Sequence, residues 1–165
     1  IDGRMQPIHG HPRNALIVID YAHTPDALEQ VLMSLKNQTE RKVYVVFGCG
    51  GERDKGKRSQ MGKVAESIAD FIIITDDNPR NESASKIRSD ILAGCPDAIQ
   101  IANRDEAIEF AINQLQHSDS LLIAGKGHEN LQLIGSETLP FNDAVVARNS
   151  VMRLRETILK SEAKK

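Results

Sequence analysis

Val43-Tyr44-Val45-Val46-Phe47, with the glycine-rich and basic stretch Gly48-Cys49-Gly50-Gly51-Glu52-Arg53-Asp54-Lys55-Gly56-Lys57-Arg58 after it, decides the fold of this chain. An apolar run without alternation is typical of a strand that is buried on both faces of a parallel sheet. Helical periodicity follows over about 60–70, and a second apolar run follows at 71–74. Because two parallel strands need a crossover between them, this order of elements predicts an α/β unit.

The same alternation extends outward from this unit in both directions. Apolar runs predict strands at 16–19, 98–101 and 121–124, and helical spacing predicts helices over 27–35, 85–93, 105–115 and about 143–159. Residues 131–140 indicate a short strand, a turn and an extended tail, with an antiparallel element near Leu131. We therefore predict one doubly wound, Rossmann-like α/β domain, with a mostly parallel sheet of about six strands and helices on both faces.

The composition fits such a domain and excludes several classes of protein. Of the 165 residues, 40% are hydrophobic and 27% are charged, which argues against intrinsic disorder. A net charge of −2 gives no electrostatic footprint for nucleic acid or for an anionic membrane. No apolar stretch reaches the roughly 18 residues of a membrane span, and no signal peptide pattern is present. Two cysteines supply neither a disulfide framework nor zinc-ligand spacing, so we expect a cytoplasmic protein.

Four polar loops are expected to carry the chemistry. Ligands of open α/β sheets bind at the carboxyl ends of the strands. That rule selects the loops 20–26, 48–59, 75–82 and 125–130, which are also the loops densest in glycine and polar residues. Position and composition therefore predict the same site.

The loop 48–59 is similar to a phosphate-binding P-loop but lacks one required residue. Gly51-x-x-x-x-Gly56-Lys57 follows a strand and precedes a helix, but Arg58 stands where a P-loop places the hydroxyl that binds magnesium. Flexible glycines, a helix start and four cations still favour an anion site, the cations being Arg53, Lys55, Lys57 and Arg58. The alternative is a solvated basic loop whose glycines serve tight turns.

The loop 75–82 combines an amide, a proline and an arginine. Pro79 fixes its own φ and biases Asn78 toward an extended conformation, which stiffens the presentation of Asn78 and Arg80. A rigid arginine beside an amide suits bidentate binding of a carboxylate. An Asx-type turn that leads into a helix near residue 83 or 85 is an equally good interpretation.

The other two loops add further polar groups. In 20–26, Thr24 and Pro25 predict a helix start, whereas Asp20 and His23 are not needed for it and lie where a nucleotide would bind. In 125–130, two glycines allow close approach of the backbone to a ligand, and Glu129 can accept from an ammonium group. An ordinary strand-exit turn is the alternative for 125–130.

Together the four loops resemble the C-terminal domain of the Mur ligases. The resemblance rests on Asp20-Tyr21-Ala22-His23-Thr24-Pro25-Asp26, on the glycine-rich stretch 47–58, on Thr75-x-Asp77-Asn78-Pro79-Arg80 and on Gly125-Lys126-Gly127-His128-Glu129, and it covers essentially the whole chain. It implies residues 1–14 as an N-terminal segment from a preceding domain, 15–160 as the C-terminal α/β domain and 161–165 as a frayed tail. It also implies an ATP-dependent, amide-forming ligase of peptidoglycan precursor synthesis.

The resemblance implies roles for individual residues. In this family Asp-Asn-Pro-Arg marks selection of meso-diaminopimelate, which is added to a UDP-N-acetylmuramoyl dipeptide. The amino acid would then contact Arg53, Asp77, Asn78, Pro79, Arg80, Gly125 and Glu129, with Arg80 on its distal carboxylate. Asp20, Tyr21 and His23 would lie near the nucleotide. No residue of this domain is implied as catalytic or as a metal ligand.

The missing P-loop limits what these residues can do. In the family, ATP and Mg²⁺ are bound mainly by a central domain, so we expect the 165 residues alone to be inactive. A start at Ile1 instead of methionine fits a piece of a longer protein. Three alternatives stay open: a lysine-adding Mur ligase, a folylpolyglutamate-type ligase domain, and a stand-alone anion- or nucleotide-binding module without catalysis.

Overall fold

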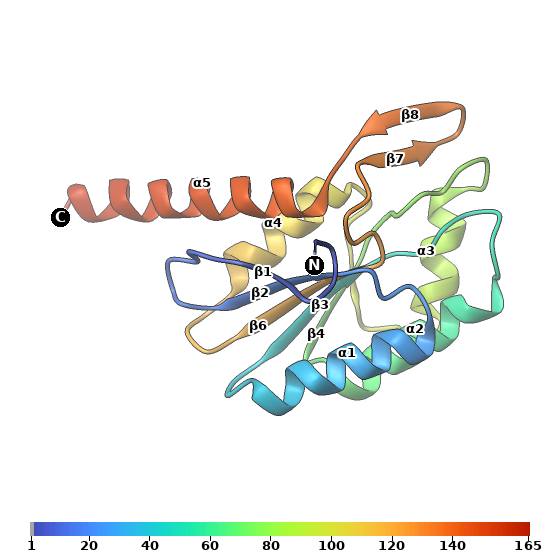
Figure 1. The fold of residues 1–165 in the computed structure, drawn as a ribbon, viewed down its shortest axis with the longest axis horizontal. Helices are drawn as coiled ribbons and strands as arrows, with labels where there is room; N and C mark the ends of the chain where they lie inside the picture. The colour runs from blue at the N-terminus through green and yellow to red at the C-terminus, as the bar shows by residue number, and fades with distance from the viewer. Residues whose placement is uncertain (1) are drawn as a thin grey trace.

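A computed structural model describes residues 2–165, and its centre is a six-stranded sheet (Figure 1). The strand order is β1-β2-β6-β3-β4-β5. Five strands run parallel, namely β2 (Leu16–Asp20), β6 (Ser120–Ala124), β3 (Val43–Phe47), β4 (Phe71–Ile74) and β5 (Ile99–Gln100). Val45 of β3 lies at the centre, opposite Leu122 of β6 and Ile72 of β4. The predicted α/β fold with a mostly parallel sheet is confirmed.

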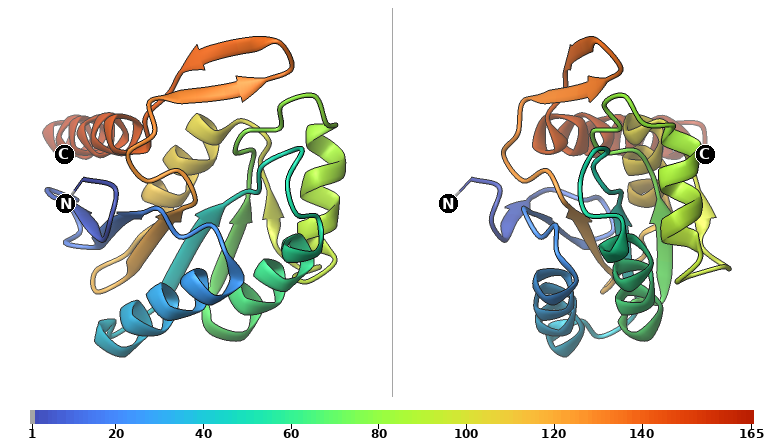
Figure 2. Two further views of the ribbon diagram at one scale, coloured as in Figure 1. Left: turned by 45° about the vertical axis from the view of Figure 1, so that its right-hand side comes forward. Right: turned by 90° about the vertical axis from the view of Figure 1, so that its right-hand side faces the viewer.

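Helices cover both faces of the sheet, as predicted (Figure 2). One face packs against α1 (Pro25–Gln38), α2 (Gly56–Ile68) and α3 (Ala84–Leu92), through apolar side chains that include Leu32, Met61 and Ile87. The other packs against α4 (Arg104–Gln114) and α5 (Asp143–Ala163), through side chains that include Ile108 and Val151. Because apolar residues fill both layers, β3 and β6 are buried along their whole length.

Local signals set several helix starts. Thr24 caps α1 by accepting from the Ala27 N–H at 3.2 Å, and Pro25 occupies the first helical position, as predicted. Asn103 and Asn142 cap α4 and α5 in the same way. Each cap sets the residue at which a loop ends and a helix begins. The caps therefore fix the loop that follows β2 and the loop that precedes α5.

The structure corrects one feature of the strand prediction and extends another. The segment interpreted as an N-terminal linker contains β1 (Gln6–Ile8). This strand pairs with β2 and is the antiparallel strand of the main sheet. Pro7 is tolerated there because β1 is an edge strand. The antiparallel element predicted near Leu131 is confirmed: β7 (Leu131–Ile134) pairs with β8 (Glu137–Pro140). The predicted extended tail is thus a second strand, and the two form a hairpin that is separate from the main sheet and projects from the body (Figure 1).

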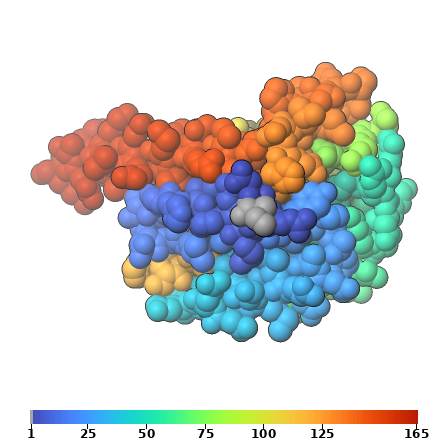
Figure 3. Space-filling view, in the orientation of Figure 1, coloured from blue at the N-terminus to red at the C-terminus, as the bar shows by residue number. Residues whose placement is uncertain are grey.

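Three helices are longer than the periodicity indicated. α1 extends beyond the predicted 27–35 at both ends. α2 begins at Gly56 instead of about residue 60, which places Lys57 and Arg58 on the helix. α5 continues to Ala163, and its C-terminal half extends away from the rest of the molecule (Figure 3). The domain boundaries at 14 and 160 stay predictions. Among residues 2–165, no helix is both long and apolar enough to cross a membrane.

Candidate functional site

The four polar loops meet at the carboxyl edge of the parallel strands, around a cavity of about 450 Å³. Its wall includes most of the residues singled out in the sequence: Tyr21, His23, Arg53, Asp77, Asn78, Arg80, Gly125 and Glu129. Thr24, Gly50, Asp54 and Lys57 complete it. The topology thus brings together side chains from all four loops, although they are up to 108 positions apart, from 21 to 129.

The loops after β3 and β4 pack directly against each other. A Cβ added to Gly51 would lie 1.8 Å from the carbonyl oxygen of Pro79, so only glycine fits this contact. The Arg80 guanidinium donates through Nη1 to the Gly51 carbonyl at 2.9 Å. The Gly51 N–H also donates to the Asn78 carbonyl at 2.8 Å, so the residues on either side of Pro79 hold the two loops together, and Pro79 itself does not line the cavity.

The backbone of Arg80 is bound to the hairpin strand β7. Its N–H donates to the Leu133 carbonyl at 3.0 Å, its carbonyl accepts from the Gly135 N–H at 2.6 Å, and its φ is +54°. The Asn78 Oδ1 atom accepts from the Leu133 N–H at 3.0 Å and not from the Arg80 N–H. The Asx-turn interpretation of this loop is therefore wrong, because the loop is held by β7.

Lys126 is a buried cation at the site for which the sequence predicted no individual role. Its side chain is 0% exposed, and Nζ lies 2.9 Å from Asn78 Oδ1 and 3.2 Å from Glu129 Oε2. Asn78 Nδ2 donates to the same Glu129 oxygen at 3.3 Å. Lys126 therefore joins the loop after β6 to the loop after β4.

Asp77 lies beneath this cluster and near a second buried cation. A Cβ added to Gly125, whose φ is +111°, would lie 2.9 Å from Asp77 Oδ2, so the glycine leaves room for this carboxylate. Burial raises the pKa of Asp77, and the positive charges of Arg104 and Lys126 oppose that rise without cancelling it. Arg104 itself is bound to Asp143, with Nε to Oδ1 and Nη2 to Oδ2 both at 2.8 Å.

The basic loop after β3 differs from the predicted anion site. Arg58 is fully buried, where Nη1 contacts Glu82 Oε2 at 3.0 Å and Asp90 Oδ2 at 3.1 Å, so its assignment to an anion site is wrong. It holds the start of α2 against α3. Lys57 donates to the His23 carbonyl at 2.8 Å and lines the cavity, and Arg53 lies exposed at its rim.

Two of the three residues expected near a nucleotide, Tyr21 and His23, form part of the wall of this cavity. Tyr21 stacks edge-on with His23 at a centroid distance of 4.5 Å, and the Arg4 guanidinium lies 5.9 Å from the Tyr21 ring. Asp20 does not line the cavity, because its carboxylate accepts from the Met5 and Ala22 N–H groups, each at 2.8 Å. Asp20 thus fixes the N-terminal segment to the end of β2.

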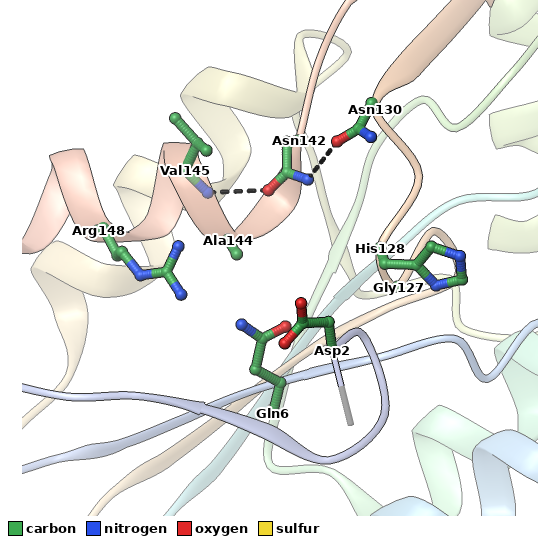
Figure 4. A pocket seen from close by; sticks show the side chains of 9 residues that line it. All are labelled: Asp2, Gln6, Gly127, His128, Asn130, Asn142, Ala144, Val145 and Arg148. Atoms are coloured by element: carbon green, nitrogen blue, oxygen red, sulfur yellow. Dashed lines mark hydrogen bonds between the residues drawn. The ribbon is translucent and has the colours of Figure 1, made fainter.

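A larger cavity of about 650 Å³ is also lined by part of the 125–130 loop, namely Gly127, His128 and Asn130 (Figure 4). It contains none of the residues to which the sequence assigned a binding role. Asn142 and Asn130 of its wall bond to each other at 2.9 Å, and Asn142 also caps α5. These two amide side chains therefore serve the helix start, and Gln6 Oε1 accepts from the Gly3 N–H at 2.8 Å. The cavity at the carboxyl edge, where buried charges converge, is the better candidate for ligand binding.

The described residues offer little for metal or thiol chemistry. Residues 2–165 contain no group of three or more His, Cys, Asp and Glu side chains that could bind a metal ion. Cys49 is 3% exposed, and burial raises the pKa of its thiol to about 12, which disfavours a nucleophilic thiolate. The cavity is therefore equipped for binding by charge and hydrogen bonds.

Comparison with known proteins gives a consistent result. Residues 3–127 match the family described as Mur ligase, glutamate ligase domain. The chain is 56% identical over 155 residues to a protein of Rickettsia montanensis and 49% identical over 152 residues to one of Agrobacterium fabrum, both named UDP-N-acetylmuramoyl-L-alanyl-D-glutamate–2,6-diaminopimelate ligase. These alignments cover 92% of this chain but only 32% and 31% of the relatives. The chain therefore spans about a third of the length of the curated relatives it matches.

Solved structures agree. One of a UDP-N-acetylmuramoyl-L-alanyl-D-glutamate–2,6-diaminopimelate ligase superposes with a TM-score of 0.87 at 43% identity, covering 94% of this chain and 32% of that one. A bifunctional folylpolyglutamate synthase/dihydrofolate synthase from Yersinia pestis, complexed with AMPPNP and Mn ion, superposes with a TM-score of 0.62 at 18% identity, covering 93% and 31%. The second likeness concerns the fold alone.

Proposed function

Because the chain belongs to the Mur ligase glutamate ligase domains, we propose that it is the amino-acid-selecting C-terminal domain of an ATP-dependent ligase. The proposed reaction adds meso-diaminopimelate to UDP-N-acetylmuramoyl-L-alanyl-D-glutamate in peptidoglycan precursor synthesis. Relatives at about half identity carry the name of that ligase. Since the chain spans about a third of their length, the activity would belong to the longer protein.

The observation that carries this proposal is the arrangement of charge around the cavity. Arg80 and Arg53 lie in the loops after β4 and β3, whereas the Glu129 carboxylate lies in the loop after β6. Cations in two loops and a carboxylate in a third suit an amino acid with carboxylate and ammonium groups at its ends. Diaminopimelate has a carboxylate at its distal end and lysine does not, so lysine would leave a cation unpaired.

The roles proposed for the residues follow from their chemistry. Glu129 accepts from the ammonium group, while Arg80 and Arg53 bind carboxylates, with Asp77, Asn78 and Gly125 shaping the cavity between them. The amine that reacts must be neutral, so that its lone pair forms the C–N bond as the acyl C–O bond to phosphate breaks. Holding the amine next to the acyl carbon is the contribution of this chain, and such positioning accounts for a large part of catalysis.

The nucleotide is proposed to be shared with the rest of the protein. When bound, ATP supplies the phosphoryl group that activates the D-glutamyl carboxylate. Asp20, Tyr21 and His23 are the residues proposed to lie near it, with the half-buried Tyr21 between His23 and the Arg4 guanidinium. The described residues do not fit a magnesium site of their own, because no three candidate ligands converge. We therefore propose that Mg²⁺ is bound by a preceding domain.

The proposal extends to partners and location. The partners are the UDP-N-acetylmuramoyl dipeptide, diaminopimelate, ATP and the preceding domains of the same chain, and the location is the cytoplasm. Nucleic acid and membrane are not among the proposed partners, in keeping with the net charge of −2.

Arg80→Ala in the full-length ligase tests the proposal. The loss of a charge-assisted contact to the distal carboxylate should raise the KM for diaminopimelate by about tenfold or more. The KM for ATP should stay within about twofold of the wild-type value. Arg153→Ala is the matched control, because Arg153 of α5 forms an exposed pair with Glu109 of α4 and neither residue lines the cavity. An unchanged KM for diaminopimelate in Arg80→Ala would show that the assignment of Arg80 is wrong.

A non-catalytic binding module is the alternative from another class. The gene upstream of Ile1 discriminates the two, because a ligase requires a P-loop with Ser or Thr after its lysine, roughly 200 residues upstream by domain size. Its absence would favour the module.

A further inference from the structure

Lys126 stands out among the charged groups of the cavity because its side chain has no exposure to solvent. It lies two residues beyond the end of β6 at Ala124, between Gly125 and Gly127, whose φ angles are +111° and +56°. Those angles are rarely adopted by other residues, and they turn the chain so that the lysine enters the protein. Burying an ammonium group is costly unless it is paired and hydrogen-bonded, so a fully buried lysine at this edge requires an explanation.

Its contacts form a closed triangle with two residues of the proposed amino-acid site. Lys126 Nζ lies 2.9 Å from Asn78 Oδ1 and 3.2 Å from Glu129 Oε2, and Asn78 Nδ2 lies 3.3 Å from the same Glu129 oxygen. Asp77 Oδ1 is further away, at 3.9 Å. The ammonium group therefore bridges the loop after β4 and the loop after β6 directly.

The triangle fixes the orientation of the Asn78 amide. Asn78 Oδ1 accepts from both Lys126 and the Leu133 N–H, so Nδ2 must point the other way, toward Glu129. Asn78 is only 7% exposed, and its side-chain oxygen Oδ1 accepts two hydrogen bonds within the protein. Within this structure Asn78 thus acts mainly as a link between β7, Lys126 and Glu129.

The triangle also orients the Glu129 carboxylate. Among the described residues, all of its hydrogen bonds and ion pairs are made through Oε2. A carboxylate has acceptor sites on both oxygens, and Oε1 has none of these contacts. With one oxygen held by Lys126 and Asn78, the other is available to an ammonium group in the cavity.

We propose that Lys126 is a positioning residue that sets the distance between the ammonium-binding carboxylate of Glu129 and the carboxylate-binding loop 77–80. The proposal rests on the proposed function, and it assigns the residue no contact with the substrate. A buried lysine that only stabilised the fold would be expected to pair with groups outside the cavity, as Arg104 does with Asp143. Lys126 instead pairs with two residues of the cavity wall.

Lys126→Met in the full-length ligase tests this role, since methionine keeps much of the side-chain length without the charge. We expect the KM for diaminopimelate to rise by about tenfold or more, and the KM for ATP to stay within about twofold. Lys36→Met is the control, because Lys36 makes a half-exposed pair with Asp70 away from the cavity. A fall in kcat alone, with both KM values unchanged, is the result of a merely structural role and would overturn the proposal.

A double-variant comparison examines whether Lys126 acts through Glu129. In a Glu129→Gln background, Lys126→Met should raise the KM for diaminopimelate by much less than in the wild type, because the partner is already altered. Equal effects in the two backgrounds would contradict the proposal. If Lys126→Met does not fold, Lys126→Gln, which can still donate to Asn78, replaces it with the same expected direction.

The two proposals can fail separately. A wild-type ligase that forms no amide with diaminopimelate contradicts the proposed function, and the role of Lys126 falls with it. A wild-type ligase that does so, with unchanged KM in the folded Lys126 variants, contradicts the role of Lys126 alone.

Discussion

Asp143→Asn removes the charge partner of Arg104, a buried arginine whose positive charge acts on Asp77 of the cavity wall. Arg104 and Asp143 are both 0% exposed and form a bidentate pair, with both N–O distances 2.8 Å. Arg104 also donates to the carbonyls of Ala124, at 3.0 Å, and Asp76, at 3.3 Å. It therefore ties the N-terminus of α5 to the ends of β6 and β4.

The expected cost of this substitution follows from what remains. The Arg104 guanidinium keeps two neutral carbonyls but loses its buried counter-charge, and such losses typically cost about 3–5 kcal/mol. We expect about 3 kcal/mol, near the lower end, because asparagine can still accept one hydrogen bond and Asp77 lies near enough to interact with Arg104.

Urea denaturation followed by circular dichroism measures this loss. With a slope of about 2 kcal/mol per molar urea, the midpoint should fall by about 1.5 M. Asp105→Asn is the control, an exposed acid in the first turn of α4 that contributes about 0.3–1 kcal/mol at most through the helix dipole. A loss in Asp143→Asn no larger than that of Asp105→Asn would refute the reasoning.

Two further predictions concern pH and backbone geometry. Burial lowers the pKa of His11 below its ordinary value of 6.5, partly opposed by its hydrogen bond to Ile112, so unfolding takes up a proton as pH falls through that value. The contribution of His11 to the free energy of unfolding should therefore be complete above about pH 6.5 and decrease below it by up to about 1.4 kcal/mol per pH unit. Denaturation at about pH 5 and about pH 7.5 should show a smaller difference in stability for His11→Gln than for the wild type. An identical difference in the two proteins would contradict this. Gly125→Ala should cost about 1–3 kcal/mol more in thermal or urea unfolding than Gly135→Ala, because both glycines have positive φ but only Gly125 faces Asp77 Oδ2, at 2.9 Å from an added Cβ. Equal losses in the two variants would show that the contact with Asp77 is unimportant.

Much of the fold and of the cavity could be predicted because the signals are local. The buried runs such as 43–47 require a covered parallel sheet, and Thr24 and Pro25 mark the start of α1 by their own chemistry. Once the strands are parallel, their carboxyl ends must share an edge, which brings Arg53, Arg80 and Glu129 to one cavity.

The features that could not be predicted depend on distant contacts. Pro7 weakens the strand signal of β1, which forms because β2 offers an unpaired edge. Gly56, a poor helix former, conceals the start of α2, and the burial of Arg58 depends on Glu82 and Asp90 from a later part of the chain. In the sequence, Lys126 does not differ from the other cations of the loops. Its role depends on the contact with Asn78, which lies 48 positions earlier in the chain.

The central claim is that this cavity selects an amino acid with a distal carboxylate. This selectivity is measured most directly by amide formation in the full-length ligase, with diaminopimelate and lysine compared as acceptors of the same acyl group. The arrangement of Arg80, Arg53 and Glu129 predicts a kcat/KM for diaminopimelate higher by a factor of about 10³ or more, since lysine leaves a site cation unpaired. Equal or better use of lysine would contradict the account.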